Sequence, residues 1–377
     1  MRPSALPVSK LLIPLLVVAL AASVERAAEA AAAGRPRIVD AAAPGRIELP
    51  SGRQVSLALP AGAALAAIEP LAGGWIVAGT RRVEAPAGDG REIFLLAGRG
   101  DGRAISLPAP PRSGRLALLR AEPLPLVENG RLAGLVWLEG QEARRFAVRF
   151  ARWDGAAWKA PRDVSPPGPG SQLALAAARL ADGSWLLAWS AFDGRDDEIL
   201  WSRLEGGQWS RLDSGRSGRL DGGQWSRPAR VAADNDVPDI TPALTAMGDG
   251  ALLAWSRFDG DGYRVVTARF SPGEDRFSPP RPIAPAGTVF PSFEPAPATA
   301  GGAWLLARSA APRGWSLFEL DADGRPLRQA AIAAATSIPQ AERPVVAGEP
   351  GGGVAFRFPA SGARRTAAWE RSPGDEP

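Results

Sequence analysis

Five acidic residues occupy a comparable place along the chain, at or near the start of a strand-like segment that contains proline. They are Glu69, Glu122, Asp239, Glu294 and Glu342. If these segments surrounded one centre, the carboxylates would form a ring that could bind a metal ion or a cationic ligand. Two of them could also act as acid and base in glycoside hydrolysis, with Asp239, Glu294 and Glu342 as candidates. The alternative is that an acidic residue beside proline is favourable turn chemistry and is solvated.

A second acidic group lies in two loop-like segments, AFDGRDDE and RFDGDGY. Oxygen-rich loops suit Ca²⁺, and the candidate ligands are Asp193, Asp196, Asp197, Asp259 and Asp261. No segment matches the calcium loop that lies between two helices. Asp-Gly is also a strong hairpin signal, which explains Asp193 and Asp259 without any ligand. Calcium is therefore the one possible cofactor that the sequence suggests.

Missing residue types exclude several other kinds of chemistry. The 377 residues include no histidine and no cysteine, which excludes the usual forms of Ser/His/Asp and Cys/His catalysis, disulfides and thiolate metal sites. No glycine-rich loop follows a strand and opens a helix, so nucleotide binding is unsupported. The net charge is only +4, and no clustered basic stripe indicates nucleic-acid binding.

The elements that would position these residues follow from an internal repeat. A strongly apolar strand recurs, as in GLVWLE, SWLLAWS and ALLAWS. The positions taken as equivalent are Gly79, Trp137, Trp189, Trp255, Arg308 and Phe356, and the steps between them are 58, 52, 66, 53 and 48 residues. The step of 66 contains a duplicated nonapeptide, RLEGGQWSR at 203–211 and RLDGGQWSR at 219–227, and without its sixteen residues it becomes 50.

Each repeat has the same internal order: a proline-bearing segment, the apolar strand, a Gly/Asp turn, an alternating strand and a short closing strand. Four short strands joined by hairpins are typical of a propeller blade, so the sequence predicts an all-β, six-bladed β-propeller. The chain ends before the last repeat has a fourth strand. We therefore expect the strand-like segment 46–60 to supply the outer strand of the last blade and close the ring.

Tryptophan is abundant, with thirteen residues. Most of them recur at repeat-equivalent positions, in the second strand (Trp137, Trp189, Trp255) and in the fourth (Trp158, Trp209, Trp225). Recurrence at one structural position predicts packing between blades. Trp315 departs from this pattern and is the candidate for contact with a ligand at the surface.

The N-terminus resembles an export signal. Arg2 and Lys10 precede an apolar run at 11–22, which is too short to span a bilayer, although an uncleaved anchor is the alternative. We predict a signal at 1–23 (its end could lie as late as about residue 33), an Ala-rich linker at 24–45, the propeller at 46–372 and a disordered tail at 373–377. The expected location is periplasmic or extracellular, with no membrane span after cleavage.

The closing hairpins LDGGQW, LEGGQW and RWDGAAW resemble the Asp-box of sialidase-like, neuraminidase-repeat propellers. The spacing from Asp154 to Trp158 and from Asp221 to Trp225 is one residue short of the family pattern, and its leading serine is missing. The resemblance implies a six-bladed propeller in which these aspartates are structural turns opposite the active site. It implies no sialidase activity, because Tyr263 is the one tyrosine and the Arg343-Pro344 pair lies in the wrong blade.

These observations favour a non-enzymatic module that binds a protein or a glycan on one propeller face, because a rigid ring presents many independent loops. The first alternative is a glycoside hydrolase or lyase that uses carboxylates of the ring. The second is a structural domain stabilised by calcium through the acidic loops.

Overall fold

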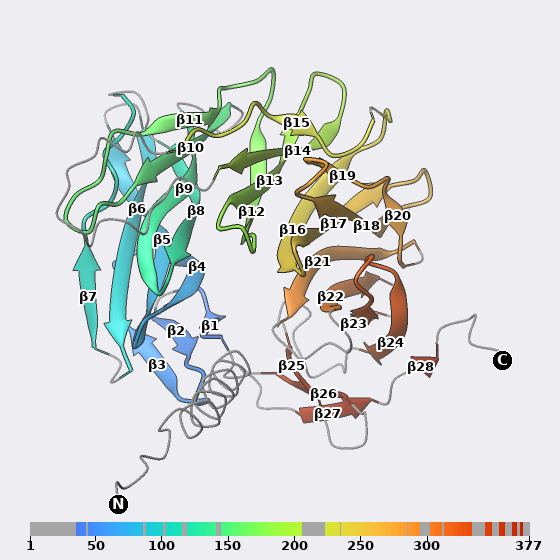
Figure 1. Ribbon diagram of the computed structural model, residues 1–377. Coiled ribbons are helices and arrows are strands. Elements are labelled where there is room, and N and C mark those ends of the chain that lie inside the picture. Colours follow the sequence, from blue (N-terminus) through green and yellow to red (C-terminus); the bar gives the residue numbers. More distant parts are fainter. Residues whose placement is uncertain are drawn as a thin grey trace, which may run out of the picture.

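The computed structural model describes residues 35–371, with gaps at 43, 86–87, 101–102, 115–118, 141–144, 206–222, 234, 285, 295–301, 311–312, 334–343, 349–353, 359–363 and 368–369. The elements in these residues are strands, and the predicted all-β, six-bladed β-propeller is confirmed. Figure 1 shows the sheets arranged around a common centre. The predicted signal, the tail at 373–377 and Glu342 lie outside the described residues.

Six antiparallel sheets follow one another along the chain, one for each predicted repeat, and the first strand of each repeat is called its inner strand below. The first three contain β4 (Ala63–Leu71), β5 (Gly74–Ala85), β6 (Gly88–Arg99) and β7 (Ala104–Leu107); β8 (Leu119–Glu128), β9 (Arg131–Gly140), β10 (Phe146–Arg152) and β11 (Arg162–Ser165); and β12 (Gln172–Arg179), β13 (Trp185–Phe192), β14 (Asp197–Leu204) and β15 (Ala229–Arg230).

The other three sheets continue the same order. They contain β16 (Asp239–Met247), β17 (Gly250–Phe258), β18 (Tyr263–Ser271), β19 (Arg276–Phe277) and β20 (Arg281–Pro282); β21 (Thr288–Glu294), β22 (Ala303–Ala310), β23 (Arg313–Leu320), β24 (Pro326–Ala333) and β28 (Glu370–Arg371); and β25 (Val345–Gly348), β26 (Val354–Arg357) and β27 (Arg364–Ala367).

The N-terminal segment differs from the prediction that it completes the last blade. Its strands β1 (Arg37–Asp40), β2 (Gly45–Glu48) and β3 (Gln54–Leu57) form a separate three-stranded sheet, and β1 lies within the segment predicted as a linker. Ile47 and Leu57 pack against Trp75 of the first repeat, and in the described residues β27 pairs only with β26. In Figure 1 this sheet lies between β4 and β25–β27. Burial of its own apolar face explains why it packs as a sheet rather than adding one strand to an edge.

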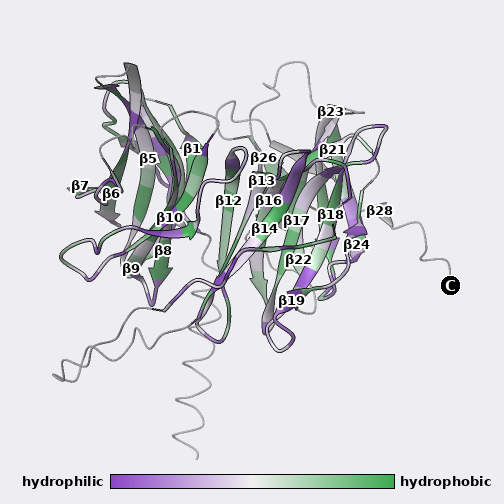
Figure 2. Cartoon of the chain, turned by 90° about the horizontal axis from the view of Figure 1, so that it is seen from above, coloured by the Kyte–Doolittle hydropathy of each residue, from purple (hydrophilic) through white to green (hydrophobic). Residues whose placement is uncertain are grey.

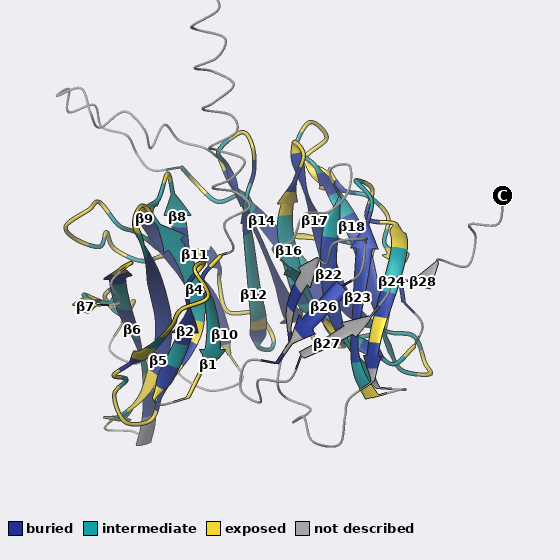
Figure 3. Ribbon diagram, turned by 90° about the horizontal axis from the view of Figure 1, so that it is seen from below, coloured by how far each residue is buried: buried dark blue, intermediate teal, exposed yellow. Residues whose placement is uncertain are grey.

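The apolar core lies between neighbouring sheets. One cluster joins each pair of repeats that are consecutive along the chain, for example Trp189 with Val148 between the second and third repeats, and Trp255 with Trp201 between the third and fourth. The predicted packing positions Trp137, Trp189 and Trp255 are fully buried, and so is Phe356 in the second strand of the last repeat. Figure 3 shows the buried residues concentrated in the middle strands, and Figure 2 shows hydrophobic strands joined by more hydrophilic loops. The recurring large side chains therefore hold the blades together, as expected.

Four inner strands share a bulge that the sequence did not predict. In β8, β12, β16 and β21, two residues lie opposite one residue of the second strand. The first bulged residue has a positive φ in each case: Glu122 (47°), Ala174 (57°), Thr241 (53°) and Phe290 (53°). The single opposing residues are Trp137, Trp189, Trp255 and Ala307. Non-glycine residues rarely adopt this backbone, so its recurrence marks a position that the surrounding structure fixes.

The bulge also corrects one sequence equivalence. The repeat spacing makes Arg308 equivalent to Trp255, but Ala307 is the residue that lies opposite the bulge of the fifth repeat. Arg308 pairs with Val289 just before the bulge, as Ser256 pairs with Ile240. Arg308 therefore matches Ser256 and, in the third repeat, Ser190.

The closing hairpins show which copy of the duplicated nonapeptide forms the hairpin of the third repeat. In the second repeat Trp153 bridges to Trp158, and in the third Leu204 bridges to Trp225, which belongs to the second copy. The side chain of Asp154 accepts hydrogen bonds from the backbone N–H groups of Ala156 and Ala157, at 3.0 and 2.8 Å. Most of the first copy, including Trp209, and Asp221 lie outside the described residues.

Among the described residues, no helix is long and apolar enough to cross a membrane.

Candidate functional site

One face of the propeller gathers most of the described candidate residues, and we call it the mouth face. It consists of the starts of the inner strands, around residues 120–122, 172–174, 239–241 and 288–290, and of the loops that follow the second strands, such as 192–197 and 258–263. Contacts between neighbouring inner strands, β12 with β16 and β16 with β21, bring these starts together. The face is therefore built from equivalent ends of successive repeats.

The predicted ring of carboxylates is not at one level of this face. Counted from the bulge, Asp239 lies two residues before Thr241, Glu122 is the bulged residue itself, and Glu294 lies four residues after Phe290. At about 3.3 Å per strand residue, this span covers roughly 20 Å. Glu69 likewise lies three residues beyond the irregularity of β4. The prolines that suggested equivalence stand at different offsets from the bulge, which explains the error.

Two of these acidic residues, Glu122 and Asp239, have structural partners. The Glu122 carboxylate accepts a hydrogen bond at 2.9 Å from the backbone N–H of Leu175 in the next repeat. The side chain of Asp239 is only 1% exposed and receives two hydrogen bonds from Arg257, at 2.7 and 2.6 Å. A buried bidentate ion pair of this kind leaves little of the carboxylate for a ligand or for acid–base chemistry.

The second repeat carries the same ion pair with the charges exchanged. Arg120 and Glu139 are paired across β8 and β9 at 2.9 Å and are 3% and 1% exposed, where Asp239 and Arg257 are paired across β16 and β17. Burial lowers the pKa of Arg120 although Glu139 opposes the shift. The hydrogen bond to Asp239 raises the pKa of Arg257 although burial opposes it. Both arginines lie over the tryptophan of their own repeat, so the pairs belong to the packing of the blades.

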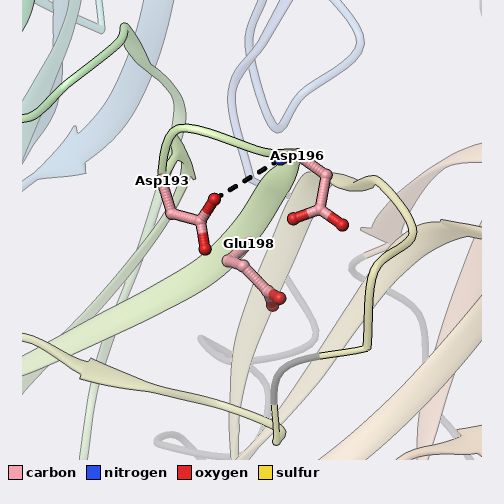
Figure 4. Close-up of side chains that lie close together, drawn as sticks. All are labelled: Asp193, Asp196 and Glu198. Carbon is pink, nitrogen blue, oxygen red and sulfur yellow. Dashed lines mark hydrogen bonds between the residues drawn. The ribbon is translucent and has the colours of Figure 1, made fainter.

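The acidic loop of the third repeat brings three carboxylates together (Figure 4). One oxygen from each of Asp193, Asp196 and Glu198 lies within 4.8 Å of the others. Arg230 pairs with Asp193 at 2.6 Å and with Glu198 at 3.5 Å, and therefore supplies positive charge where a cation would otherwise do so. Asp193 also accepts a hydrogen bond from the N–H of Arg195, which lowers its pKa.

The other predicted calcium ligands are not part of this group in the described structure. Asp197 is half-buried, and its pKa is raised by burial and by the charges of Asp196 and Asp193. In the fourth repeat Asp259 accepts hydrogen bonds from the N–H groups of Asp261 and Gly262, at 3.2 and 3.1 Å. Asp259 also pairs with Arg264. Hairpin chemistry therefore accounts for Asp259, which was the alternative interpretation.

Trp315 is not a surface residue. Its side chain is 9% exposed, and it packs against Val346 and Phe356 in the cluster between the fifth and last repeats. The register places it beside Arg308 on the neighbouring strand, facing the next blade. The prediction that it contacts a ligand directly was therefore wrong. Trp315 departs from the tryptophan pattern because it lies in the third strand of its blade, but it packs between blades as the other tryptophans do.

Three exposed apolar side chains on the mouth face escaped the sequence reasoning. Leu173, Phe192 and Phe290 are 42%, 37% and 48% exposed. Leu173 and Phe290 lie just before and within the shared bulges, and the N–H of Phe192 bonds to the carbonyl of Ser171 beside them. The sequence contained a signal, because these apolar residues stand beside or within the pattern of buried residues of their strands. The comparison of the repeats did not use it, because it relied on prolines and carboxylates.

Two surface hollows lie away from these carboxylates. One of about 630 Å³ lies at the outer edge between the third and fourth repeats and is lined by Val231, Phe277 and Pro279, among others. The other, of about 520 Å³, lies on the first repeat and includes Gly74, Arg99 and Ile105. Neither is lined by an acidic residue of the predicted ring, so neither has the carboxylate pair that a glycoside hydrolase needs.

Comparison with known proteins gives similarity of fold. No protein-family model matches the chain, and no curated protein matches it. A solved protein of unknown function from Dyadobacter fermentans DSM 18053 is 13% identical, covering 89% of this chain and 98% of that one, with a TM-score of 0.49. The Hadza microbial sialidase Hz136 is 9% identical (75% and 73% covered, TM-score 0.40), and the GH43 endo-arabinanase from Bacillus licheniformis is 14% identical (69% and 94% covered, TM-score 0.37). The strands of the chain itself establish the six-bladed β-propeller, and we take no activity from these distant likenesses.

Proposed function

We propose that the protein is an exported, non-enzymatic binding module that holds a protein partner on its mouth face. One observation carries the proposal: Leu173, Phe192 and Phe290 expose apolar surface there. Exposed aliphatic and aromatic side chains on one face favour a protein partner over a glycan, because they offer burial of apolar area with few hydrogen-bonding groups. Export rests on the predicted signal at 1–23, and the hairpin at Asp154 fits an Asp-box-like structural turn.

The carboxylates of the same face support binding rather than catalysis. Asp239 is held by Arg257, and Glu122 by the neighbouring backbone. A general acid or base needs a carboxyl group that can reach substrate and exchange a proton. Groups engaged in structural pairs suit a rigid platform, on which the exposed apolar residues supply the contact area.

The test is capture of a partner from the native envelope and medium with the immobilised mature protein. The variant Leu173→Ser/Phe290→Asn should lose the captured protein, and asparagine suits the positive φ of Phe290. Ile105→Ser is the matched control, because Ile105 is 58% exposed on the outermost strand of the first repeat. Capture of no protein by the wild type, or equal loss in the control, would overturn the proposal. Binding on a glycan array that survives Leu173→Ser/Phe290→Asn would point to a glycan instead.

A further inference from the structure

In three repeats, one residue of the second strand lies at the contact with the next repeat, and we call its place the seam position. It is the residue that pairs with the inner-strand residue just before the bulge. In the third repeat the hydroxyl of Ser190 donates to the carbonyl of Asp239 in the next repeat, at 3.2 Å. In the fourth, the hydroxyl of Ser256 accepts from the N–H of Phe290 in the next repeat, at 3.1 Å. Both serines thereby tie neighbouring blades at the mouth.

The fifth repeat has Arg308 at this seam position. A guanidinium group is much longer than a hydroxyl and carries a charge, so it cannot repeat the same small bridge. The contacts of Arg308 are instead two aromatic rings: its guanidinium carbon lies 5.9 Å from the ring centre of Phe290 and 5.9 Å from that of Trp315. In the described part of the chain, no hydrogen-bond acceptor or carboxylate pairs with it.

Other arginines near the mouth have carboxylate partners. Arg257 pairs with Asp239 at 2.6 Å, and Arg230 pairs with Asp193 at the same distance. Arg308 is half-buried, and a half-buried guanidinium with N–H groups to spare is an unusual arrangement, since charged groups are normally paired when they leave water. The two rings restrict its orientation while they leave its hydrogen-bonding edges available.

We propose that Arg308 binds a carboxylate of the protein partner, with Phe290 as the apolar surface beside it. This inference rests on the proposed function and specifies the partner: an acidic segment in which Asp or Glu is next to an apolar side chain. The planar guanidinium matches a carboxylate in a two-point hydrogen bond. Phe290, 48% exposed, offers the neighbouring apolar residue a contact.

The first experiment measures the binding of a simple carboxylate, acetate, to Arg308 in the absence of any protein partner. In ¹⁵N spectra of arginine side chains, the Nε–H signal of Arg308, assigned from its loss in Arg308→Lys, should move with sodium acetate and reach saturation. Sodium chloride at the same ionic strength should not move it in this way. Arg313 is an exposed arginine of the same blade, and its signal should show no saturation. A saturable shift of Arg308 supports the site, and its absence overturns it.

The second experiment uses a labelled peptide that alternates leucine and glutamate, and its glutamine counterpart. The acidic peptide should bind at least tenfold more tightly than the glutamine peptide, and Arg308→Gln should abolish that difference. Arg313→Gln removes the same charge and should change the affinity less than twofold. Equal effects of the two variants would show general electrostatic attraction and overturn the site. Loss of partner capture in Leu173→Ser/Phe290→Asn with no acetate shift at Arg308 would leave the binding face standing and remove only this inference.

Discussion

The mouth face and the outer rim of the propeller, which consists of the closing hairpins and closing strands, differ in how closely the backbone is repeated from one blade to the next. At the mouth, four inner strands keep the same bulge in the same register although the bulged residues are a glutamate, an alanine, a threonine and a phenylalanine. At the rim, the closing hairpin varies in length: four residues separate Trp153 from Trp158, whereas residues 205–224 separate Leu204 from Trp225. At the mouth, the backbone conformation is thus the same from repeat to repeat although the side chains differ. At the rim, the length of the backbone hairpin itself varies.

This difference follows from the number of neighbours. An inner strand contacts its own sheet and the inner strands of adjacent repeats, so a change in its path would disturb three sheets at once. A closing strand has one paired neighbour and solvent on its other side, as in β11 and β15. Insertions at such an edge cost little beyond the closure of a longer loop. Four predictions test this contrast.

The largest effect is expected from breaking the ion pair of the fourth repeat at the mouth. Asp239→Asn leaves Arg257 without its charge partner beside a buried aromatic ring. Removal of one member of a buried pair costs about 3 kcal/mol of unfolding free energy. Denaturant titration monitored by tryptophan fluorescence measures the loss, provided that the transition is two-state.

Asp249→Asn is the exposed control in the same repeat, in the turn that joins β16 to β17 at the end away from the mouth face. Asp249 pairs with Arg269 at 2.8 Å, but its side chain is 80% exposed. Exposed pairs contribute about 0–1 kcal/mol, so this variant should unfold close to the wild type. Equal losses in the two variants would contradict the special importance of the buried pair at the mouth.

The second effect concerns the seam serine. Ser256 is fully buried, and Ser256→Ala removes the acceptor of the Phe290 N–H, which then lacks that partner. This hydrogen bond is part-buried, so leaving its donor without a partner should cost about 1–2 kcal/mol. Ser190→Ala is the comparison, because it removes a donor from a carbonyl that has a second lone pair, and about 1 kcal/mol is expected. A neutral Ser256→Ala would mean that the seam is held by apolar packing alone.

The repeats themselves show how far sequence reasoning reached. The predicted second strands were found correctly, as shown by the positions of Gly79, Trp137, Trp189, Trp255 and Phe356. A strand that is buried in every repeat must be apolar in every repeat, so its composition can be recognised in the sequence. The carboxylate ring failed because proline marks a turn or an extended segment but does not fix register. Register depends on the bulge, which is a property of two strands and the neighbouring repeat. The ion pair between Asp239 and Arg257 could not be predicted either, because it joins two strands and the sequence comparison considered one strand of each repeat at a time.

The third prediction concerns the rim. Deletion of the sixteen residues 204–219 leaves RLDGGQWSR intact and shortens the chain segment between the bridged leucine and Trp225 from twenty residues to four, as in the second repeat. Loop-closure entropy then favours the deletion variant by about 1.4 kcal/mol. Replacement of 206–221 by sixteen Gly and Ser residues keeps the length and should leave stability unchanged. A deletion variant less stable than the wild type would show that the first copy makes contacts that matter.

The smallest effect is expected from two aspartates, Asp197 and Asp193, in the mouth loop of the third repeat, and it depends on pH. Burial and the charges of Asp196 and Asp193 raise the pKa of Asp197, so the folded state prefers its protonated form. This contribution is present below the unfolded pKa and is lost as the pH rises through the folded pKa. Asp197→Asn should therefore gain stability relative to the wild type as the pH rises from acid to neutral.

Asp193 provides the opposite sign within the same loop. The hydrogen bond from the N–H of Arg195 lowers its pKa, so its contribution is present above the unfolded pKa and is lost as the pH falls through the folded pKa. Asp193→Asn should lose stability relative to the wild type as the pH rises. Melting temperatures of both variants across pH 3 to 7, roughly the range in which carboxyl groups titrate, separate the two cases. Parallel slopes would mean that only the summed charge of the loop matters. Opposite slopes would mean that the pKa of each of the two carboxyl groups is set by its own neighbours.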